Sequence, residues 1–487
     1  MDAPLDVFRS TNSILWGSTV VAGATALLSF FKPRWAIPGF FIWVAAADVL
    51  KRLLFLGSEA TPTQAEYFWI LALPDLVLAA AMGGIVLTAI RARSLPWRWT
   101  TLDSLVAAYL LWSFLEVFNP TFSLTVRLAG FKSSGIYVLV YFLVRAADAQ
   151  EKGWFKRLLP VLIGSGLVAA VYALYQSAVG FQEFEMEWLE SGLTMLGGQG
   201  GELGRTINWF GIARPFSIFA SHEQLGWYLS FVVLLMLAVR VQGRWSWGVL
   251  FVLVLAIART LSRSSWVFLG ASLLFLGIGG LIAARKRLVR NGAAALVLML
   301  VCLGLWSYLE RRTNEQPATA EDSQANPFVQ RASTLGTYEW RIYSFQQLIR
   351  DPSWRRPFGN GIGSMWVAWR LGAPGTLNRE ERVLSHVGTV DLIYELGVVG
   401  MLSFLAIIAY LAWLVWRVLK HPLESEGVEL LVVTSASVLG LVVANSTVTT
   451  VLMFRPIASP FWLSLGIAGC VLAARERPTS SLGTEAT

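Results

Sequence analysis

Long apolar segments separated by short polar ones fill almost the whole chain. A helix needs about 20 mostly apolar residues to cross the hydrocarbon core of a bilayer. The pattern predicts an all-α polytopic membrane protein with 12 or 13 transmembrane helices. If the first segment does not cross, the N-terminus changes sides and the remaining topology is unaffected. The expected spans are 13–31, 35–56, 67–90, 102–118, 131–147, 158–180, 222–239, 245–259, 265–284, 292–308, 387–416, 428–449 and 456–474.

Basic residues in alternate connections predict the orientation. An excess of Lys and Arg in short connections marks the cytoplasmic side of a membrane protein. We therefore place one end of the predicted spans in the cytoplasm and the segments 181–221 and 309–386 outside. The cytoplasmic set is Lys32, Arg34, Arg91, Arg93, Arg98, Arg145, Lys152, Lys156, Arg157, Arg240, Arg244, Arg285, Lys286, Arg287, Arg290, Arg417, Lys420, Arg475 and Arg477.

Composition supports the same interpretation. The chain is 55% hydrophobic and 14% charged, whereas a soluble protein carries about 25% charged residues. The net charge of +8 is a topology signal, and no basic stripe interleaved with aromatic residues predicts a nucleic-acid partner. Cys302 and Cys470 lie in apolar segments, and neither D-x-D nor H-E-x-x-H occurs. We therefore expect no disulfide framework, no metal site and no cofactor.

The segment 309–386 is a long external connection, whereas typical connections have about 4–6 residues. Four of its apolar residues recur at helical spacing and predict a helix. The glycines of "FGNGIGS" end that helix, and "WVAWRLG" predicts a second short one. We expect this loop to cap the outer membrane face. The four apolar positions are Tyr338, Ile342, Phe345 and Ile349.

His386 is the candidate for proton transfer. It directly precedes an apolar segment and is the one histidine in the external loop. Histidine titrates near neutrality and can accept a proton from a hydroxyl group. The alternative is an interfacial histidine that caps a helix or binds a carbonyl group.

The external arginines are candidates for binding phosphate. The loop 309–386 holds ten arginines and no lysine, and the planar guanidinium group binds pairs of phosphate oxygens. Arg341 lies off the apolar face of the predicted helix. The alternative for these residues is a solvated face or contact with lipid head groups.

Further charges lie near the outer ends of predicted spans. Arg259 and Arg263 stand between two apolar segments with almost no loop, where a charge costs roughly 2.5–3.5 kcal/mol on insertion scales; snorkelling to the interface is the alternative. Arg214 and His222 precede a span on the same side. His222 with Glu223 could form a catalytic pair, but we favour a helix start capped by the preceding serine. Glu395, nine residues after His386, could orient a substrate or pair with an external arginine.

Four motifs in this order resemble the O-antigen ligase and O-antigen polymerase superfamily. They are "ARPFSIFASHEQLGWYLS", "SRSSW", "WRIYSFQQLI…PFGNGIGS" and "SHVGTVDLIYELGVVG". The resemblance covers roughly residues 205–415 of what we expect to be a single membrane domain, 1–487. One position departs from the family: an Asn often follows the histidine there, and Val387 stands here.

This resemblance implies a C-type glycosyltransferase architecture in the bacterial inner membrane, with its active site on the periplasmic face. Such enzymes move a glycan from an undecaprenyl-diphosphate carrier to an acceptor hydroxyl group, with inversion and without metal. His386 would be the general base, Arg214, Arg263 and Arg341 would hold the diphosphate, and Arg259 and Glu395 would support them.

Other functions remain open on the sequence. A ligase would transfer a finished glycan to lipid A-core, and a polymerase would join carrier-linked repeats; the motifs do not separate the two. A transporter or flippase of a lipid-linked anion would also need arginines, but it predicts inverted repeats and charged residues near the bilayer midplane; we see no such repeat, and the best candidate charges lie at the outer rim. A non-catalytic scaffold would leave His386 replaceable.

Overall fold

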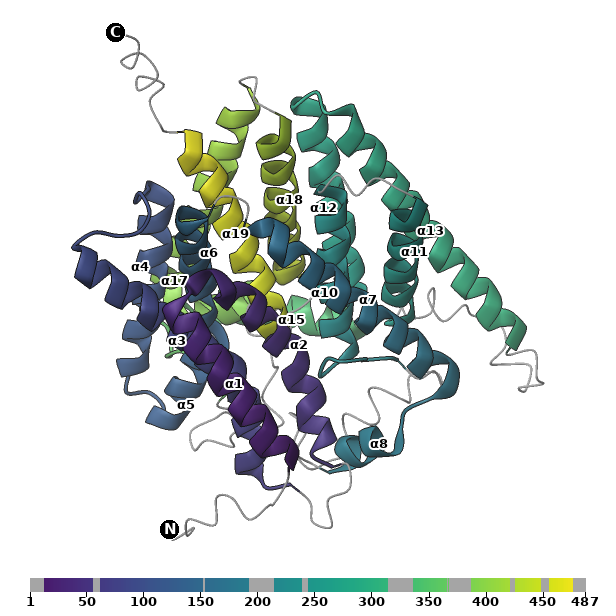
Figure 1. Cartoon of the computed structure of the whole chain (residues 1–487), viewed down its shortest axis with the longest axis horizontal. Helices are drawn as coiled ribbons and strands as arrows, with labels where there is room; N and C mark the ends of the chain where they lie inside the picture. The colour runs from purple at the N-terminus through teal and green to yellow at the C-terminus, as the bar shows by residue number, and fades with distance from the viewer. Residues whose placement is uncertain are drawn as a thin grey trace.

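The computed structural model describes residues 13–55, 62–151, 154–191, 214–238, 244–313, 336–365, 367, 387–420, 425–447 and 455–475. Within these ranges the regular elements are all helices (Figure 1), which confirms the all-α prediction. Each of the thirteen predicted spans coincides with a helix. The long helices are α1 (Ser13–Phe31), α2 (Ala36–Leu53), α3 (Gln64–Ala92), α4 (Thr101–Leu115), α6 (Leu139–Gln150), α7 (Phe155–Val179), α10 (His222–Ala238), α11 (Arg244–Arg259), α12 (Arg263–Ile282), α13 (Lys286–Thr313), α17 (Gly388–Leu419), α18 (Ser425–Thr447) and α19 (Arg455–Arg475).

Shorter elements join and cover these helices. α5 leads through a π-helical turn and a 3-10 turn into α6, so that 124–150 forms one apolar run. The short helices are α5 (Leu124–Gly130), α8 (Glu183–Glu190) and α15 (Gly336–Arg350), and the turns are η1 (Pro33–Trp35), η2 (Glu116–Phe118), η3 (Phe131–Gly135), η4 (Ile136–Val138) and η5 (Pro352–Arg355).

Nine helices among the described residues are long and apolar enough to cross a membrane. The protein is therefore a multi-pass membrane protein. The predicted spans in α2, α10, α11 and α13 fall outside this set. α2 carries Asp48, Lys51 and Arg52 near its C-terminus, and α10 and α11 have only 17 and 16 residues. The nine are α1, α3, α4 with η2, α5 to α6, α7, α12, α17, α18 and α19.

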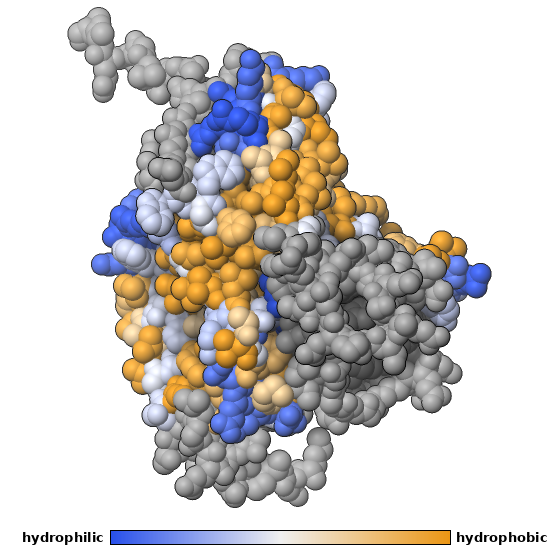
Figure 2. All heavy atoms as spheres, turned by 90° about the vertical axis from the view of Figure 1, so that its right-hand side faces the viewer, coloured by the Kyte–Doolittle hydropathy of each residue, from blue (hydrophilic) through white to orange (hydrophobic). Residues whose placement is uncertain are grey.

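The surface has the distribution of side chains that a bilayer requires. On the face that Figure 2 shows, apolar residues form a broad band, and hydrophilic residues gather chiefly above and below it. Large side chains such as Leu27, Val168 and Leu274 are exposed on the helices. Lipid, rather than water, is the environment in which such exposure carries no hydrophobic cost.

Small residues let the helices approach closely. A Cβ atom at Gly440 of α18 would overlap Ser272 Oγ of α12, and one at Gly84 of α3 would overlap the Phe30 carbonyl of α1. Helices in a bilayer associate through such close contacts because lipid supplies no hydrophobic drive. Pro74 and Pro160 lie inside α3 and α7, as expected for membrane helices.

The contacts of α18 show which helix ends share one side of the bundle. Gly440 contacts Ser272, and Val432 contacts Gly279, so α12 and α18 run antiparallel. The N-terminus of α12 therefore lies at the C-terminal end of α18. Gly388 at the start of α17 also contacts this end, at Asn445. The starts of α12 and α17 therefore lie on the same side of the bundle.

Candidate functional site

Two of the predicted site arginines lie at helix ends, and a third lies in the segment that leads into the helix before them. Arg214 precedes α10, Arg259 is the last residue of α11, and Arg263 is the first of α12. Arg214 is 3% exposed and Arg259 is 7% exposed. A buried guanidinium group is costly unless the fold gives it partners, so their placement is a specific feature of this end of the protein.

A tight turn fixes the two arginines of α11 and α12. Ser262 caps α12, because its Oγ accepts a hydrogen bond from Ser265 N. Ser262 N donates in turn to Thr260 Oγ1 at 3.2 Å. α10 packs against this turn, since Trp227 Nε1 donates to Ser264 Oγ at 2.9 Å. The starts of α10 and α12 and the end of α11 thus form one rigid corner.

Arg214 is held by the first residue of α10. Its NH1 group lies 2.9 Å from His222 Nε2. A guanidinium group has no acceptor, so Nε2 must accept and the neutral ring carries its proton on Nδ1. Ser221 Oγ accepts from Gln224 N at 3.3 Å, which confirms the predicted helix cap. We conclude that His222 positions Arg214.

Arg259 and the segment before α10 are both tied to α7. Arg259 NH2 donates to the Ser177 carbonyl at 3.2 Å. Ser217 N donates to Gln176 Oε1 at 2.7 Å, and Ser217 Oγ donates to the Ala169 carbonyl at 2.6 Å. These bonds bring Arg214 and Arg259 to the same end of α7.

A buried charged network that the sequence analysis did not predict supports this corner. Arg52 NH1 pairs with Glu185 Oε1 at 3.0 Å, and Gln176 Nε2 donates to the same oxygen at 2.7 Å. The Arg52 guanidinium also lies 4.9 Å from the ring centroid of Phe216. Arg52 on α2 and Glu185 on α8 therefore anchor the segment that carries Arg214. Their only signal in the sequence was opposite charge at the same predicted membrane surface.

More charges extend this network along the same side. Lys51 pairs with Asp48 at 2.7 Å, and Arg455 at the start of α19 lies 3.9 Å from Asp48. Lys132 pairs with Asp75 at 3.3 Å. Positive and negative side chains alternate through this network, so they neutralise one another. This arrangement favours a role in holding the helices together over binding of an external anion.

α17 is broken where a single long span was predicted. Gly397 has φ +69° and ψ −173°, so a half-helix over 388–396 ends there and a second helix continues to Leu419. The freed carbonyl groups are used by other parts of the chain. Asn360 N donates to the Tyr394 carbonyl at 2.8 Å, Gly361 N to the Glu395 carbonyl at 3.1 Å, and Trp112 Nε1 to the Leu396 carbonyl at 2.8 Å.

The glycine-rich loop "FGNGIGS" is therefore a docking element for the break in α17. Gly359, Gly361 and Gly363 all have positive φ. A Cβ atom at Gly359 would overlap the Glu395 carbonyl, and one at Gly363 would lie against Val126 O and the backbone of Gly130. Gly359 and Gly363 therefore serve close backbone packing, and Gly361 serves the positive φ.

Glu395 takes part in the same docking. It is 2% exposed, and its Oε1 accepts a hydrogen bond from Met365 N at 3.1 Å. The carboxylate thereby joins the half-helix 388–396 to the residues that follow the glycine-rich loop. This contact gives Glu395 a positioning role for the start of α17.

The substitution Gly397→Ala is expected to destabilise the protein. Positive φ costs an L-residue about 1–2 kcal/mol, and the new Cβ would overlap Pro357 O and Gly359 N. The matched control is Gly270→Ala in α12, where a Cβ meets nothing within 4 Å and alanine favours the helix. In detergent, the thermal unfolding temperature should fall for Gly397→Ala and stay unchanged for Gly270→Ala. Equal unfolding temperatures for the two variants would contradict the docking role of Gly397.

Two predicted site residues have no described side-chain geometry. His386 lies outside the described residues and directly precedes them at Val387. Arg341 lies on α15, as predicted, but only its backbone is described. The helix "WVAWRLG" also lies outside the described residues, apart from position 367. The structure therefore brings Arg214, Arg259 and Arg263 together and places the start of α17 on the same side of the bundle.

The expected loop 309–386 differs from the structure in two details. α13 continues to Thr313, so the connection begins later than predicted. On α15 the predicted apolar face is exposed at Ile342 and Ile349, whereas Ser344 is buried and Leu348 packs with residues near the start of α17. The helix is confirmed, but another of its faces contacts the bundle.

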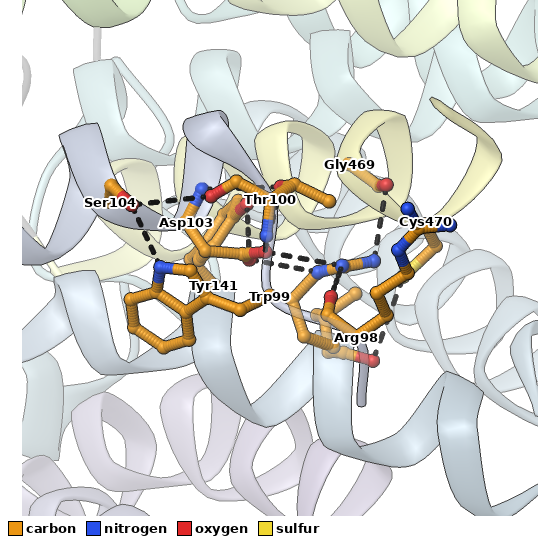
Figure 3. Close-up of polar contacts among 10 residues, drawn as sticks. Arg98, Trp99, Thr100, Asp103, Ser104, Tyr141, Gly469 and Cys470 are labelled. Atoms are coloured by element: carbon orange, nitrogen blue, oxygen red, sulfur yellow. Dashed lines mark hydrogen bonds and ion pairs between the residues drawn. The ribbon is translucent and has the colours of Figure 1, made fainter. Parts of the chain in front are cut away.

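The opposite end of the bundle holds a buried ion pair. Arg145 was counted among the residues of the basic connections, but it lies inside α6, within the predicted span 131–147, and is buried. Its Nε and NH2 groups donate to the Asp103 carboxylate at 2.9 and 3.2 Å. Tyr141 and Thr100 also donate to Asp103, and Arg145 reaches the carbonyl groups of Gly469 and Arg98 (Figure 3). These bonds use the donors and acceptors of the pair internally, which is typical of a structural clamp.

Comparison with known proteins adds no family assignment. The sequence matches no protein-family model, and no curated protein matches it. The resemblance to O-antigen ligases and polymerases therefore stays a prediction from the motifs.

Proposed function

We propose that this protein is a membrane glycosyltransferase that moves a glycan from an undecaprenyl-diphosphate carrier to an acceptor hydroxyl group. The observation that carries the proposal is the corner of buried Arg214 and Arg259 with Arg263, on the side of the bundle where α17 begins after His386. The basic residues of the other side favour an inner-membrane protein whose site faces the periplasm.

The proposed reaction needs a base and fixed positive charge. His386 takes the proton of the acceptor hydroxyl, whose oxygen attacks the anomeric carbon of the donor sugar. The bond between that carbon and the diphosphate oxygen breaks, the carrier diphosphate leaves with the electron pair, and the configuration inverts. Negative charge on the leaving group increases as this bond breaks. Preorganised arginines in a poorly hydrated site stabilise such charge strongly, and in this scheme they replace a metal ion.

The residues of the corner divide this work. Arg214 and Arg263, with Arg341 from α15, hold the diphosphate, and Arg259 adds positive charge beside them. His222 keeps Arg214 in place through the 2.9 Å contact. Glu395 holds the half-helix that follows His386 through its bond to Met365 N. The lipid tail of the carrier lies among the membrane helices, and the loop 309–386 covers the acceptor.

The acceptor separates two versions of this function. In a ligase, lipid A-core receives the finished glycan, and this is the version we favour. In a polymerase, a second carrier-linked glycan receives it. A transporter or flippase of the same lipid-linked anion would use the arginines for binding alone and would release its substrate unchanged.

An assay with purified protein distinguishes these cases. Undecaprenyl-diphosphate-linked oligosaccharide is incubated without divalent metal, with and without lipid A-core, and the products are separated on a gel. One shifted band that needs lipid A-core indicates a ligase, and a ladder without it indicates a polymerase. Folded protein that binds the donor and yields no product in either case would contradict the transferase and favour the transporter.

Replacing Arg214 or Arg259 with lysine is expected to lower the transfer rate about 10²–10³-fold, the effect of losing one preorganised donor. Lysine keeps the charge but lacks the planar fork that binds two oxygens. Arg157→Lys is the matched control, because Arg157 is half-exposed and pairs with Glu151 at 2.6 Å. Initial rates at saturating donor should fall in the first two variants only. An unchanged rate in both would remove the arginine corner from the proposal.

A further inference from the structure

An open apolar groove lies on the side of the bundle opposite the arginine corner. Its volume is about 660 Å³, within the range of ligand-binding cavities. The C-terminal part of α3, the connection to α4, and residues of α4 and α6 form its walls. Ile90 is 67% exposed and Val86 is 52% exposed, so the groove opens towards the lipid that surrounds the helices. Its lining includes Met82, Val86, Ile90, Trp97, Trp99 and Phe142.

The aromatic wall of this groove is fixed before any ligand binds. Trp97 stacks on Trp99 with ring centroids 6.4 Å apart, and Trp99 stacks on Phe142 at 6.1 Å. The buried clamp of Figure 3 holds the same connection, because Arg145 NH2 donates to the Arg98 carbonyl at 2.9 Å. Trp99 Nε1 also donates to Ser104 Oγ at 2.7 Å. Binding would therefore require little ordering of the wall.

One cation stands at the rim of the apolar wall. Arg93 and Ser94 line the groove where α3 ends. Arg93 is exposed, and among the described residues it forms no ion pair. Arg91 is equally at the helix end and exposed, but it does not line the groove. An apolar trough with a basic rim at the cytoplasmic membrane surface is complementary to a lipid with an acidic head group.

We infer that this groove binds an anionic phospholipid of the cytoplasmic leaflet. One acyl chain lies along α3 and the aromatic wall, and the phosphodiester group contacts the Arg93 guanidinium. A zwitterionic phospholipid would fill the same trough but would neutralise its own phosphate with its ammonium group. The site thus selects for net negative charge, and it is independent of the proposed transferase chemistry.

Native mass spectrometry of the purified full chain tests this site. Phosphatidylglycerol and phosphatidylcholine of identical acyl chains are titrated separately, and the first binding constant of each is measured. The wild type should prefer phosphatidylglycerol. Arg93→Ala should weaken phosphatidylglycerol binding about tenfold or more, since a hydrogen bond to a charged group is lost. Arg91→Ala, the matched control, should stay within about fivefold, the effect of one surface charge.

Filling the trough tests its apolar part. Ala89 lines the groove and is partly exposed, so Ala89→Trp should reduce binding of both lipids. Equal binding of the two lipids by the wild type, or equal effects of Arg93→Ala and Arg91→Ala, would overturn the proposal. If Ala89→Trp does not fold, the comparison of the two arginine variants decides the question alone, because both replace exposed side chains.

Discussion

Replacing His386 with alanine is expected to lower the rate of glycan transfer by about 10²–10⁴-fold, the usual contribution of a positioned general base. The acceptor hydroxyl has no other proton acceptor in the proposed scheme. The half-helix that follows His386 is held by four contacts at its break, from Asn360, Gly361, Trp112 and Met365. Such support is what a base needs to stay in one position.

The measurement is the initial rate with saturating undecaprenyl-diphosphate donor and the acceptor that the gel assay identifies. His421→Ala is the matched control, since His421 follows Lys420 in the connection predicted to face the cytoplasm. Donor binding should be similar in wild type and His386→Ala, because the arginines rather than the histidine hold the diphosphate. A rate in His386→Ala close to that of His421→Ala would eliminate His386 as the base and favour a scaffold.

The largest loss of stability is expected for Arg145→Leu, at about 3–5 kcal/mol, because it leaves the Asp103 carboxylate buried without its counter-charge. Asp103 is fully buried and Arg145 nearly so. The substitution also removes the donors that reach the carbonyl groups of Gly469 and Arg98. α4, α6 and α19 would thus lose the contacts that join them at this end.

Unfolding in detergent, followed by heat or by denaturant, measures this loss. The control is Arg157→Leu, whose ion pair with Glu151 is short but half-exposed and should contribute about 0–1 kcal/mol. The double variant Asp103→Asn with Arg145→Leu should be more stable than Arg145→Leu alone, because it removes the buried charge. If Arg145→Leu and Arg157→Leu lost the same free energy of unfolding, the Arg145–Asp103 pair would contribute little to stability.

The membrane architecture could be predicted from the chain alone. Each of the thirteen apolar segments coincides with a helix, most with ends shifted by only a few residues, as for 35–56 and α2 (Ala36–Leu53). The segment 131–147 instead begins in the turns that precede α6, and nine helices among the described residues are long and apolar enough to cross a membrane. Local hydrophobicity suffices here, because an apolar segment that faces lipid can satisfy its backbone polar groups only by forming a helix. The placement of Arg259 and Arg263 at helix ends could be predicted because a charged side chain is costly inside the bilayer.

Contacts between distant segments could not be predicted in this way. Nothing local to "YELGVVG" distinguishes a broken helix from a straight one, and the break at Gly397 exists because the loop at 359–361 supplies the missing hydrogen bonds. The sequence placed Arg145 near the end of a span, but its pairing with Asp103 became evident only in the fold. Arg52 and Glu185 are 133 residues apart, and their pairing depends on where α8 docks.

The sequence by itself determined the membrane class, the helix positions and which charges lie near a surface, because these follow from the free energy of placing each segment in lipid or water. The tertiary structure alone decided which of those charges meet. It brought Arg214, Arg259 and Arg263 to one corner, matched Arg145 with Asp103, and made the glycine-rich loop at 359–363 a docking surface for α17. The reason is that a buried charge or a freed backbone group is stable only beside a specific partner, and that partner comes from the packing of helices far apart in the chain.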